Sequence, residues 1–186
     1  MDAIRLDAPC AGERILALHA GDRVLLSGTV YTARDAAHRR MVELLGRGEE
    51  LPFCLEGAAI YYCGPAPAPP GRVIGAAGPT TSGRMDAYAP LLIERGLRLM
   101  IGKGPRSAAV LEAMRAHGAA YLAAAGGAGA LLASCITECE LVAWPELGPE
   151  AVRRLTAEDM PLTGAAAAHG GNLHITGPAA WLGHSA

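Results

Sequence analysis

Aromatic side chains and net charge are both scarce in this sequence. Phe, Trp and Tyr make up 4% of the 186 residues, and 16 basic against 18 acidic residues leave a formal charge of −2. A chain so close to neutral has no overall attraction for nucleic acid or for an anionic membrane surface, so neither class of partner is expected. Any binding of an anion must therefore depend on a local cluster of cations.

The sequence also favours neither a disulfide framework, an export signal nor a membrane span. The five cysteines are an odd number at irregular spacing, which favours a reducing compartment. Asp2, Arg5 and Asp7 stand where a signal peptide needs an apolar core, so a cytoplasmic location is expected. The longest uncharged stretch, residues 118–137, is built largely of Ala and Gly, and it favours a buried strand and helix over a membrane span.

Cys135 and Cys139 raise the question of a metal site. They lie four residues apart, so on a helix they would share one face and could form a metal pair. No third or fourth ligand is nearby, and free cysteine is usually a small core residue. Burial is therefore favoured over metal binding, and no metal ligand is assigned to this chain.

What the sequence does contain is a pattern of apolar strand, polar loop and helix that occurs three times. This pattern and the length predict one α/β domain, residues 1–186, with strand-loop-helix units around a mixed sheet. Residues 1–20 form a lead-in with short strands around Ile4, Leu6 and Ile15 to Leu18, and the Pro-rich connector 47–71 carries a strand at 58–63. The units are a strand at 24–26 ending at 27–29 with a helix from Thr32 to about Leu45, a strand at 72–74 with a helix from Met85, and a strand at 97–101 with a helix over 108–117.

The helix of the first unit begins with an unusual charge pattern. Thr32 with Asp35 three residues later is typical of a capping box. Arg34 lies in the first turn, where the helix dipole favours acidic residues, and His38 lies one turn further on the same face. A cation at this unfavourable end indicates a functional role, while a surface arginine paired with a neighbouring acid is the alternative.

The second unit contains the stretch around which the chain is organised, Gly75 to Asp86. Its glycines, hydroxyl side chains and free backbone N–H groups lead into a helix, and Arg84 adds a forked cation at the same place. This combination predicts an anion site. The alternative is an ordinary tight turn in which Pro79 and the glycines bend the chain and Ser82 caps the helix.

The third unit places Lys103 between two glycines at the end of a strand. The surrounding loop lacks the spacing of a Walker A motif. In an open α/β sheet the carboxyl ends of the strands meet at one crevice, so Arg34, Arg84 and Lys103 are expected to converge. Together with loop N–H groups and nearby hydroxyls they suit a small, doubly charged anion, either a dicarboxylate or a phosphate. These hydroxyls belong to Thr29, Thr80, Thr81 and Ser82.

Several motifs, in the same order along the chain, resemble the β subunit of two-subunit class I fumarases and tartrate dehydratases. They are similar also to the C-terminal domain of the single-chain class I enzymes. The resemblance covers residues 20–162, whereas the tail 163–186 departs from the family pattern and is given no role. The matching stretches are Ser27-Gly28, residues 32–38 (Thr-Ala-Arg-Asp-Ala-Ala-His), 62–65 (Tyr-Cys-Gly-Pro), 78–86 (Gly-Pro-Thr-Thr-Ser-Gly-Arg-Met-Asp), 102–104 (Gly-Lys-Gly), Gly126-Gly127 and 144–148 (Trp-Pro-Glu-Leu-Gly).

The resemblance implies a swivelling β/β/α domain that completes the active site of an iron-sulfur hydro-lyase. The 4Fe-4S cluster of that family is held by cysteines of a separate α subunit and not by this chain, in an expected heterotetramer (α2β2). The implied reaction is the reversible hydration of fumarate to (S)-malate, and L(+)-tartrate dehydration is the alternative. Two further hypotheses are a non-catalytic carboxylate- or phosphate-binding module and a purely structural assembly partner.

The resemblance also implies roles for individual residues. Arg34, Arg84 and Lys103 match the substrate-binding cations, and Thr80 matches the position of a base that removes the carbon-bound proton. A neutral hydroxyl is a poor base, so Thr80 needs nearby cations that stabilise its alkoxide. Thr81 and His38 are assigned to substrate binding, with orientation of the loop or capping of the helix as the alternative for His38 and for Asp35.

Overall fold

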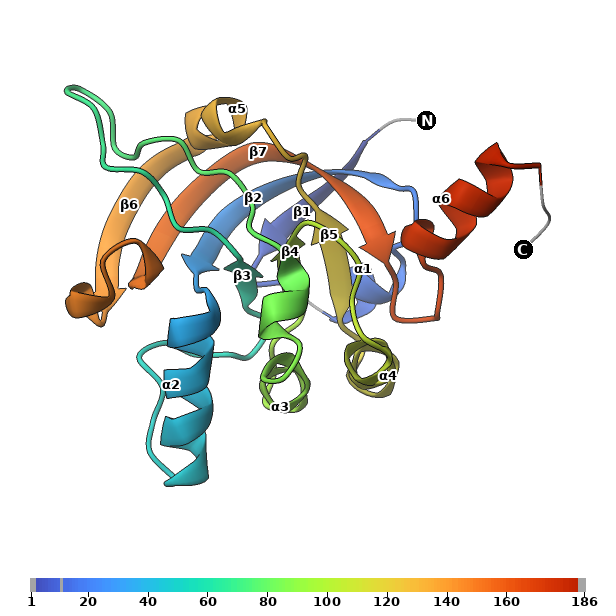
Figure 1. Cartoon of the computed structure of the whole chain (residues 1–186), viewed down its shortest axis with the longest axis horizontal. Helices are drawn as coiled ribbons and strands as arrows, with labels where there is room; N and C mark the ends of the chain where they lie inside the picture. The colour runs from blue at the N-terminus through green and yellow to red at the C-terminus, as the bar shows by residue number, and fades with distance from the viewer. Residues whose placement is uncertain (1–2, 11, 184–186) are drawn as a thin grey trace.

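The computed structural model describes residues 3–10 and 12–183, and it shows a twisted sheet with helices on both faces (Figure 1). The sheet has seven strands in the order β1-β2-β3-β4-β5-β7-β6. The strands are β1 (Ile4–Ala8), β2 (Arg23–Thr32), β3 (Ala59–Tyr61), β4 (Leu99–Gly102), β5 (Ala120–Ala123), β6 (Ile136–Ala143) and β7 (Val152–Ala166). The helices are α1 (Gly12–Leu16), α2 (Asp35–Gly46), α3 (Ala89–Glu94), α4 (Ala108–His117), α5 (Gly129–Ser134) and α6 (Leu173–Trp181), with 3-10 helices η1 (Ser82–Met85) and η2 (Pro145–Glu150).

The sheet is mixed, as the sequence predicts. β1 to β5 pair in parallel with their neighbours, whereas β7 runs antiparallel to β2, β5 and β6. Because the long strand β7 pairs with both β2 and β5, the pairings β2-β3-β4-β5-β7-β2 form a closed circuit. The prediction of a mixed α/β fold is confirmed.

Two hydrophobic cores lie on the two faces of the sheet. Side chains alternate along a strand, so Leu99 and Ile101 of β4 enter one core and Met100 enters the other. The first core includes side chains from α1 and α5, and the second includes side chains from α2, α3 and α4. Figure 1 shows these last three helices together below the sheet. This arrangement sets the start of α2 beside the carboxyl ends of β3 and β4.

Elements with strong local signals are confirmed. The predicted helix over 108–117 is α4, which starts after an N-cap at Ser107 and ends at Gly118 in the left-handed region (φ 68°). Strand β3 lies within the predicted range 58–63, and β4 overlaps the predicted range 97–101 but ends one residue later, at Gly102. Residues 118–137 contain β5 and α5. Within the described parts of the chain, no helix is both long and apolar enough to cross a bilayer.

The first predicted strand is longer than expected. The prediction that it ends at residues 27–29 is wrong, because β2 continues to Thr32 and Thr29 pairs with Thr156 of β7. Gly28 adopts φ 93° at a register shift in this ladder, and a Cβ there would lie 2.2 Å from the Ala8 carbonyl oxygen. The glycine therefore marks a bulge within a strand. Thr29 is part of the ladder and does not lie at a strand end.

The predicted capping box at Thr32 is also wrong. The buried Thr32 hydroxyl donates to the Ala151 carbonyl (3.3 Å) and accepts from the Arg153 N–H (3.0 Å). These partners lie more than a hundred residues away, where local sequence gives no signal. The N-terminus of α2 is instead satisfied by Glu150, whose carboxylate accepts from the Ala36 N–H (3.1 Å).

Three further local predictions are wrong. Residues 72–74 form no strand, so the loop 75–86 belongs to no strand-loop-helix unit, and Ser82 does not cap a helix because it is the first residue of η1. Ile15 lies in α1 and not in a strand. Cys135 follows α5 whereas Cys139 lies in β6, so the two cysteines share no helix face.

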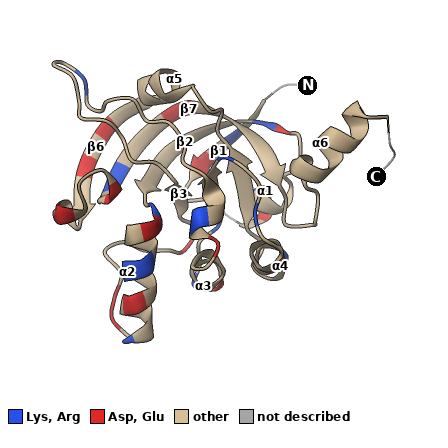
Figure 2. Ribbon diagram, viewed as in Figure 1, with Lys and Arg blue, Asp and Glu red and all other residues tan. Residues whose placement is uncertain are grey.

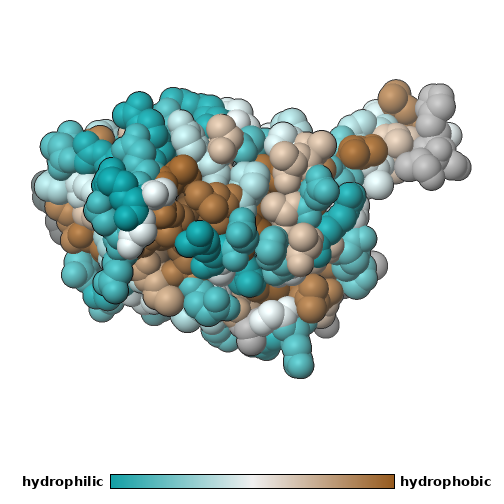
Figure 3. All heavy atoms as spheres, turned by 90° about the horizontal axis from the view of Figure 1, so that it is seen from below, coloured by the Kyte–Doolittle hydropathy of each residue, from teal (hydrophilic) through white to brown (hydrophobic). Residues whose placement is uncertain are grey.

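The end of the chain continues the sheet and then leaves it. β7 extends through Ala166, past residue 162, and its residues 163–166 pair with β5. α6 then projects from the body of the molecule, and apolar atoms cover part of it (Figures 1 and 3). Its Trp181 is 89% exposed. Residues 1–2 of the predicted lead-in and 184–186 of the predicted tail lie outside the described residues.

Candidate anion-binding site

The loop from Pro79 to Ser82 lies at the carboxyl ends of β3 and β4. The Thr80 N–H donates to the Tyr62 carbonyl (2.7 Å), and the Lys103 N–H donates to the Thr80 carbonyl (3.3 Å). The Ser82 N–H donates in turn to the Lys103 carbonyl (2.8 Å), so the loop runs as an extended segment beside the end of β4. This is the edge at which ligands bind in open α/β sheets.

Arg34 and Arg84 meet at the first residue of α2. Arg84 Nη2 lies 2.8 Å from Asp35 Oδ2, and Arg34 Nε lies 4.0 Å from Asp35 Oδ1. Arg34 Nη2 also lies 3.0 Å from Glu150 Oε1. Both arginines therefore contact the same carboxylate. Arg34 also has an acidic partner, as expected from the alternative interpretation of a surface arginine paired with a neighbouring acid.

A shallow pocket of about 450 Å³ opens at this charge cluster. Figure 2 shows acidic and basic segments side by side at the start of α2. Arg34 and Arg84 are 22% and 48% exposed, so both guanidinium groups remain within reach of a ligand from solvent. The pocket is lined by Arg34, Asp35, Ala36, Arg39, Tyr88, Leu147, Pro149 and Glu150.

Lys103 is the only lysine of the sequence and lies at the other end of the same loop. Its side chain is exposed, and among the described residues no carboxylate lies within 4.0 Å of its ammonium group. The residue before it must be glycine, because a Cβ on Gly102 would lie 2.1 Å from Ser82 Oγ. Lys103 is therefore a cation at the sheet edge whose charge is not neutralised by a neighbour.

Thr80 and Thr81 occupy the middle of the loop. Thr80 is half-buried and Thr81 is exposed. Thr81 pairs as a bridge with Lys103, so the backbone fixes both threonines beside the lysine. Arg84 follows in η1, only a few residues further on, and its side chain reaches Asp35. The loop therefore connects the Lys103 end of the site to the arginine cluster.

His38 lies beneath the site and not on its surface. Its ring is fully buried, and its Nδ1 lies 2.9 Å from the Arg34 carbonyl oxygen. Its edge faces the Tyr62 ring at 5.2 Å, and its Nε2 has no partner among the described residues. Burial lowers the pKa of His38 to about 4, so the ring is neutral at physiological pH. Such a ring can orient the backbone of Arg34 directly.

A buried polar network that sequence reasoning missed supports the loop from below. Arg106 Nε donates to Asp86 Oδ1 (2.7 Å), and the guanidinium lies between the Tyr62 and Tyr121 rings, 5.2 and 5.1 Å from their centroids. The Ser82 and Tyr121 hydroxyl oxygens lie 2.9 Å apart. The network ties the start of η1 to the loop before α4, which limits movement of both site loops.

Glu150 is the second residue that sequence reasoning missed. Its carboxylate accepts from the Ala36 N–H and pairs with Arg34, so one side chain caps α2 and holds a site cation. The sequence signal was weak, since Glu150 lies two residues after the Trp-Pro-Glu-Leu-Gly motif and carries no feature of its own. Arg106 likewise lies in the polar loop that contains Lys103, and nothing in the sequence assigns it a role.

The described residues offer no cluster that suits a metal. No group of three His, Cys, Asp or Glu side chains comes together within residues 3–10 and 12–183. The groups that the described site does present are cations, hydroxyls and backbone N–H groups.

This chain is an α/β domain that gathers arginine, lysine and threonine side chains at the edge of its sheet. The family can be stated more narrowly, because the sequence model described as fumarase C-terminus matches residues 1–177. This chain belongs to that family. The resemblance to class I fumarases and tartrate dehydratase β subunits is confirmed.

Curated relatives agree with this assignment. The chain is 42% identical over 166 residues to the anaerobic class I fumarate hydratase of Escherichia coli strain K12, a match that covers 86% of this chain and 30% of that protein. It is 44% identical over 143 residues to fumarate hydratase 2 of Leishmania major, covering 76% of this chain and 25% of the relative. The chain thus spans about a third or less of these relatives.

A relative of matching length carries a different name. The chain is 38% identical over 163 residues to the putative L(+)-tartrate dehydratase subunit beta of Methanocaldococcus jannaschii, and the match covers 84% of both proteins. This chain is therefore similar in extent to a separate β subunit and similar in sequence to one part of the longer fumarate hydratases.

Proposed function

We propose that this chain is the β subunit of an iron-sulfur-dependent hydro-lyase that reversibly hydrates fumarate to (S)-malate. The observation that carries the proposal is the junction of Arg34 and Arg84 on Asp35, beside a loop that also holds Thr80 and Lys103. The names of the relatives support the same class of reaction. In this proposal the chain supplies substrate binding and proton transfer to a site that a partner completes.

The cations are suited to the two carboxylates of the substrate. Arg34 and Arg84 can each present a planar fork of N–H donors to a carboxylate, and Lys103 adds a point charge. Asp35 and Glu150 hold the two forks in place before substrate binds. The three cations outnumber the two protein carboxylates, those of Asp35 and Glu150, so the empty site carries a net positive charge. This charge favours the binding of a dianion.

Thr80 is the proposed base for the carbon-bound proton. The hydroxyl must first lose its own proton, and nearby cations stabilise the resulting alkoxide. The loop hydrogen bonds place Thr80 next to Lys103, whose charge has no carboxylate partner among the described residues. Thr81 is proposed to contact substrate. The assignment of His38 changes from contact to positioning, since its ring is buried under Arg34.

The proposal includes a partner that holds the cofactor. The described residues of this chain do not offer a ligand set for a cluster. A cysteine-bearing α subunit would hold a 4Fe-4S cluster, whose open iron supplies Lewis-acid chemistry at the substrate hydroxyl. The chain would act as a swivelling β/β/α domain against that subunit, in a cytoplasmic heterotetramer of two α and two β subunits.

Tartrate dehydration is a second candidate, because the M. jannaschii relative that matches this chain in extent carries that name. Both substrates are small dicarboxylates, so the cation cluster accommodates either. A non-catalytic carboxylate- or phosphate-binding module and a structural assembly partner are the remaining alternatives. The cations and Thr80 at one sheet edge favour catalysis over both.

Anaerobic reconstitution with a cysteine-bearing α subunit separates these functions. The mixed subunits are assayed with fumarate, (S)-malate, L(+)-tartrate and mesaconate, and each subunit is assayed alone. Turnover of fumarate by the mixture supports the proposal, and turnover of tartrate alone selects the second candidate. Binding of dicarboxylates without turnover of any would identify a non-catalytic module.

A further inference from the structure

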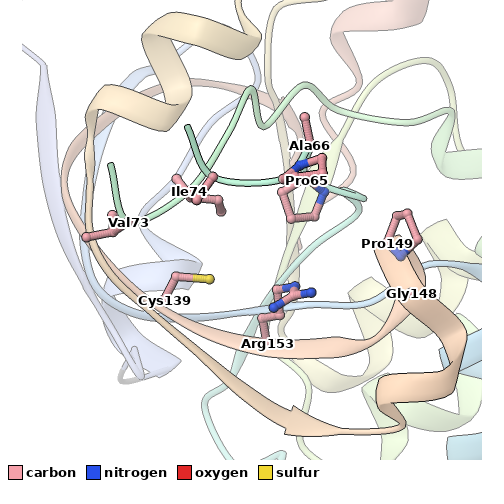
Figure 4. A pocket seen from close by; sticks show the side chains of 10 residues that line it. Pro65, Ala66, Val73, Ile74, Cys139, Gly148, Pro149 and Arg153 are labelled. Carbon is pink, nitrogen blue, oxygen red and sulfur yellow. The ribbon is translucent and has the colours of Figure 1, made fainter. Parts of the chain in front are cut away.

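A second pocket, shown in Figure 4, shares Pro149 with the pocket at the cation cluster. Its volume is about 320 Å³, at the small end of the range for ligand pockets. Cys139 of β6 and Arg153 of β7 form its floor, and residues 65–68 with Val73 and Ile74 form an apolar wall. Gly148 and Pro149 of η2 close one end.

The apolar wall belongs to the Pro-rich segment 64–76, which we call the proline arm. The arm folds back on itself, because the Ala66 N–H donates to the Ala76 carbonyl (3.0 Å) and the Gly75 N–H donates to the Ala66 carbonyl (3.2 Å). A Cβ on Gly75 would lie 2.4 Å from the Pro67 carbonyl oxygen, so this close approach requires glycine. The arm is thus a fixed wall.

Arg153 gives the pocket its charge. In the described parts of the chain, no carboxylate lies within 4.0 Å of its guanidinium, and its Nε is buried without a hydrogen-bond partner. The neighbouring Arg154, by contrast, is exposed and paired with Glu140. Burial raises the pKa of the Cys139 thiol, so this group stays protonated and does not neutralise Arg153. Arg153 therefore brings to the pocket a positive charge that no carboxylate of the described residues neutralises.

We propose that this pocket is a second ligand site, which binds a small organic monocarboxylate. The Arg153 guanidinium donates hydrogen bonds to the carboxylate, and the proline arm, which includes Ile74, covers the apolar body of the ligand. Neither Arg153 nor the proline arm has a role in the proposed reaction. Binding here does not depend on the proposed activity.

The site is placed to influence the cation cluster. Pro149 lines both pockets, and the next residue, Glu150, pairs with Arg34. A Cβ on Gly64 would lie 2.9 Å from Arg34 Nη1 and 3.1 Å from the Pro149 carbonyl oxygen, so the start of the arm lies against both. A ligand in contact with Pro149 would therefore lie one residue from Glu150, the partner of Arg34.

Benzoate is a suitable probe, because it joins a carboxylate to a rigid apolar body. The full chain is labelled with ¹⁵N and titrated while amide chemical shifts are followed. Saturable shifts of Cys139, Gly148 and Arg153 are expected, and benzyl alcohol, which has the same ring without the charge, should not produce them.

Two neighbouring arginines provide matched variants. Arg153→Gln should weaken benzoate binding by at least about tenfold, Arg153→Lys should retain part of it, and Arg154→Gln should leave it unchanged. Arg84→Gln tests whether the probe binds at the cation cluster instead, and should also leave these shifts unchanged. The proposal is overturned if the pocket amides do not shift, or if Arg153→Gln binds benzoate as the natural chain does.

Discussion

Arg84 is the residue on which the proposed chemistry depends most directly. Its guanidinium reaches Asp35 from η1, so it is already held in a planar, forked geometry before substrate arrives. Lysine keeps the charge but has no fork, so Arg84→Lys separates geometry from electrostatics.

Arg84→Lys is expected to cost about 2–4 kcal/mol of transition-state stabilisation, which is roughly 30- to 1,000-fold in kcat/KM. The measurement is steady-state kinetics of the reconstituted subunits, with Arg47→Lys as the matched control because Arg47 is an exposed arginine at the far end of α2 and does not line the pocket at the cation cluster. Kinetics equal to those of the natural pair would show that Arg84 does not contact the substrate.

Thr80 is tested through its proton. Thr80→Ala should abolish exchange of the carbon-bound substrate proton with solvent deuterium, whereas Thr80→Ser should keep measurable exchange because it retains the hydroxyl. The exchange is followed by NMR in the reconstituted pair. Exchange at the natural rate in Thr80→Ala would assign the base to another residue.

The stability of the protein should depend on pH through His38, because the pKa of this residue falls on folding from 6.5 to about 4. Between these pH values the unfolded chain binds a proton that the folded chain does not, so stability is present above pH 6.5 and is lost as the pH falls towards 4. The loss amounts to about 3 kcal/mol. The free energy of unfolding, measured by urea denaturation, should therefore fall by about 3 kcal/mol less in His38→Gln than in the natural chain over this pH range. An identical pH dependence of the two proteins would contradict a neutral, buried ring.

At the scale of elements, the start of α2 depends on a side chain from the far end of the sequence. Glu150 of η2 accepts from the Ala36 N–H and pairs with Arg34. Packing of η2 against the helix therefore sets both the stability of α2 and the position of a site cation.

Glu150→Gln should lower the free energy of unfolding by about 1 kcal/mol, because the charge that favours the helix N-terminus is lost. It should also raise KM in the reconstituted pair, since Arg34 loses its partner. Glu146→Gln is the matched control, because Glu146 lies in the same 3-10 helix, is more exposed and pairs with Arg40. Equal effects of the two variants would show that Glu150 has no special place in the site.

Dependence on residues far away in the sequence also explains which elements could be predicted. α4 was predictable because Ser107, an apolar stripe and Gly118 all lie within a dozen residues. The end of β2 was not, because its last residues are held by β7, and the partners of Thr32 lie beyond residue 150. The loop 75–86 was recognised as part of a site, but its hydrogen bonds to β3 and β4 follow from sheet topology and not from a preceding strand.

The candidate site shows the same division. Arg34, Arg84 and Lys103 could be chosen from the sequence because each stands in a polar loop or at a helix start. Their supports could not, since Arg106 meets Tyr62 and Tyr121 only after the sheet has formed. The burial of His38 depends likewise on tertiary packing, since its ring lies against Tyr62.

At the scale of the whole molecule, the extent of the chain can be compared with that of its relatives. It corresponds to about 30% of the E. coli fumarate hydratase and to most of the M. jannaschii β subunit. Its charge cluster opens to solvent at the edge of the sheet, where a partner could close it. An exposed site of this kind explains why the proposed activity requires a second subunit that excludes water from the reacting atoms.

The most direct test of this account is the anaerobic conversion of fumarate to malate by this chain, by a cysteine-bearing α subunit carrying its cluster, and by the two together. The account predicts conversion only in the mixture, with loss of most of the rate when Arg84→Lys replaces the natural chain. Conversion by the metal-free chain alone, or equal conversion by the α subunit with and without this chain, would contradict it.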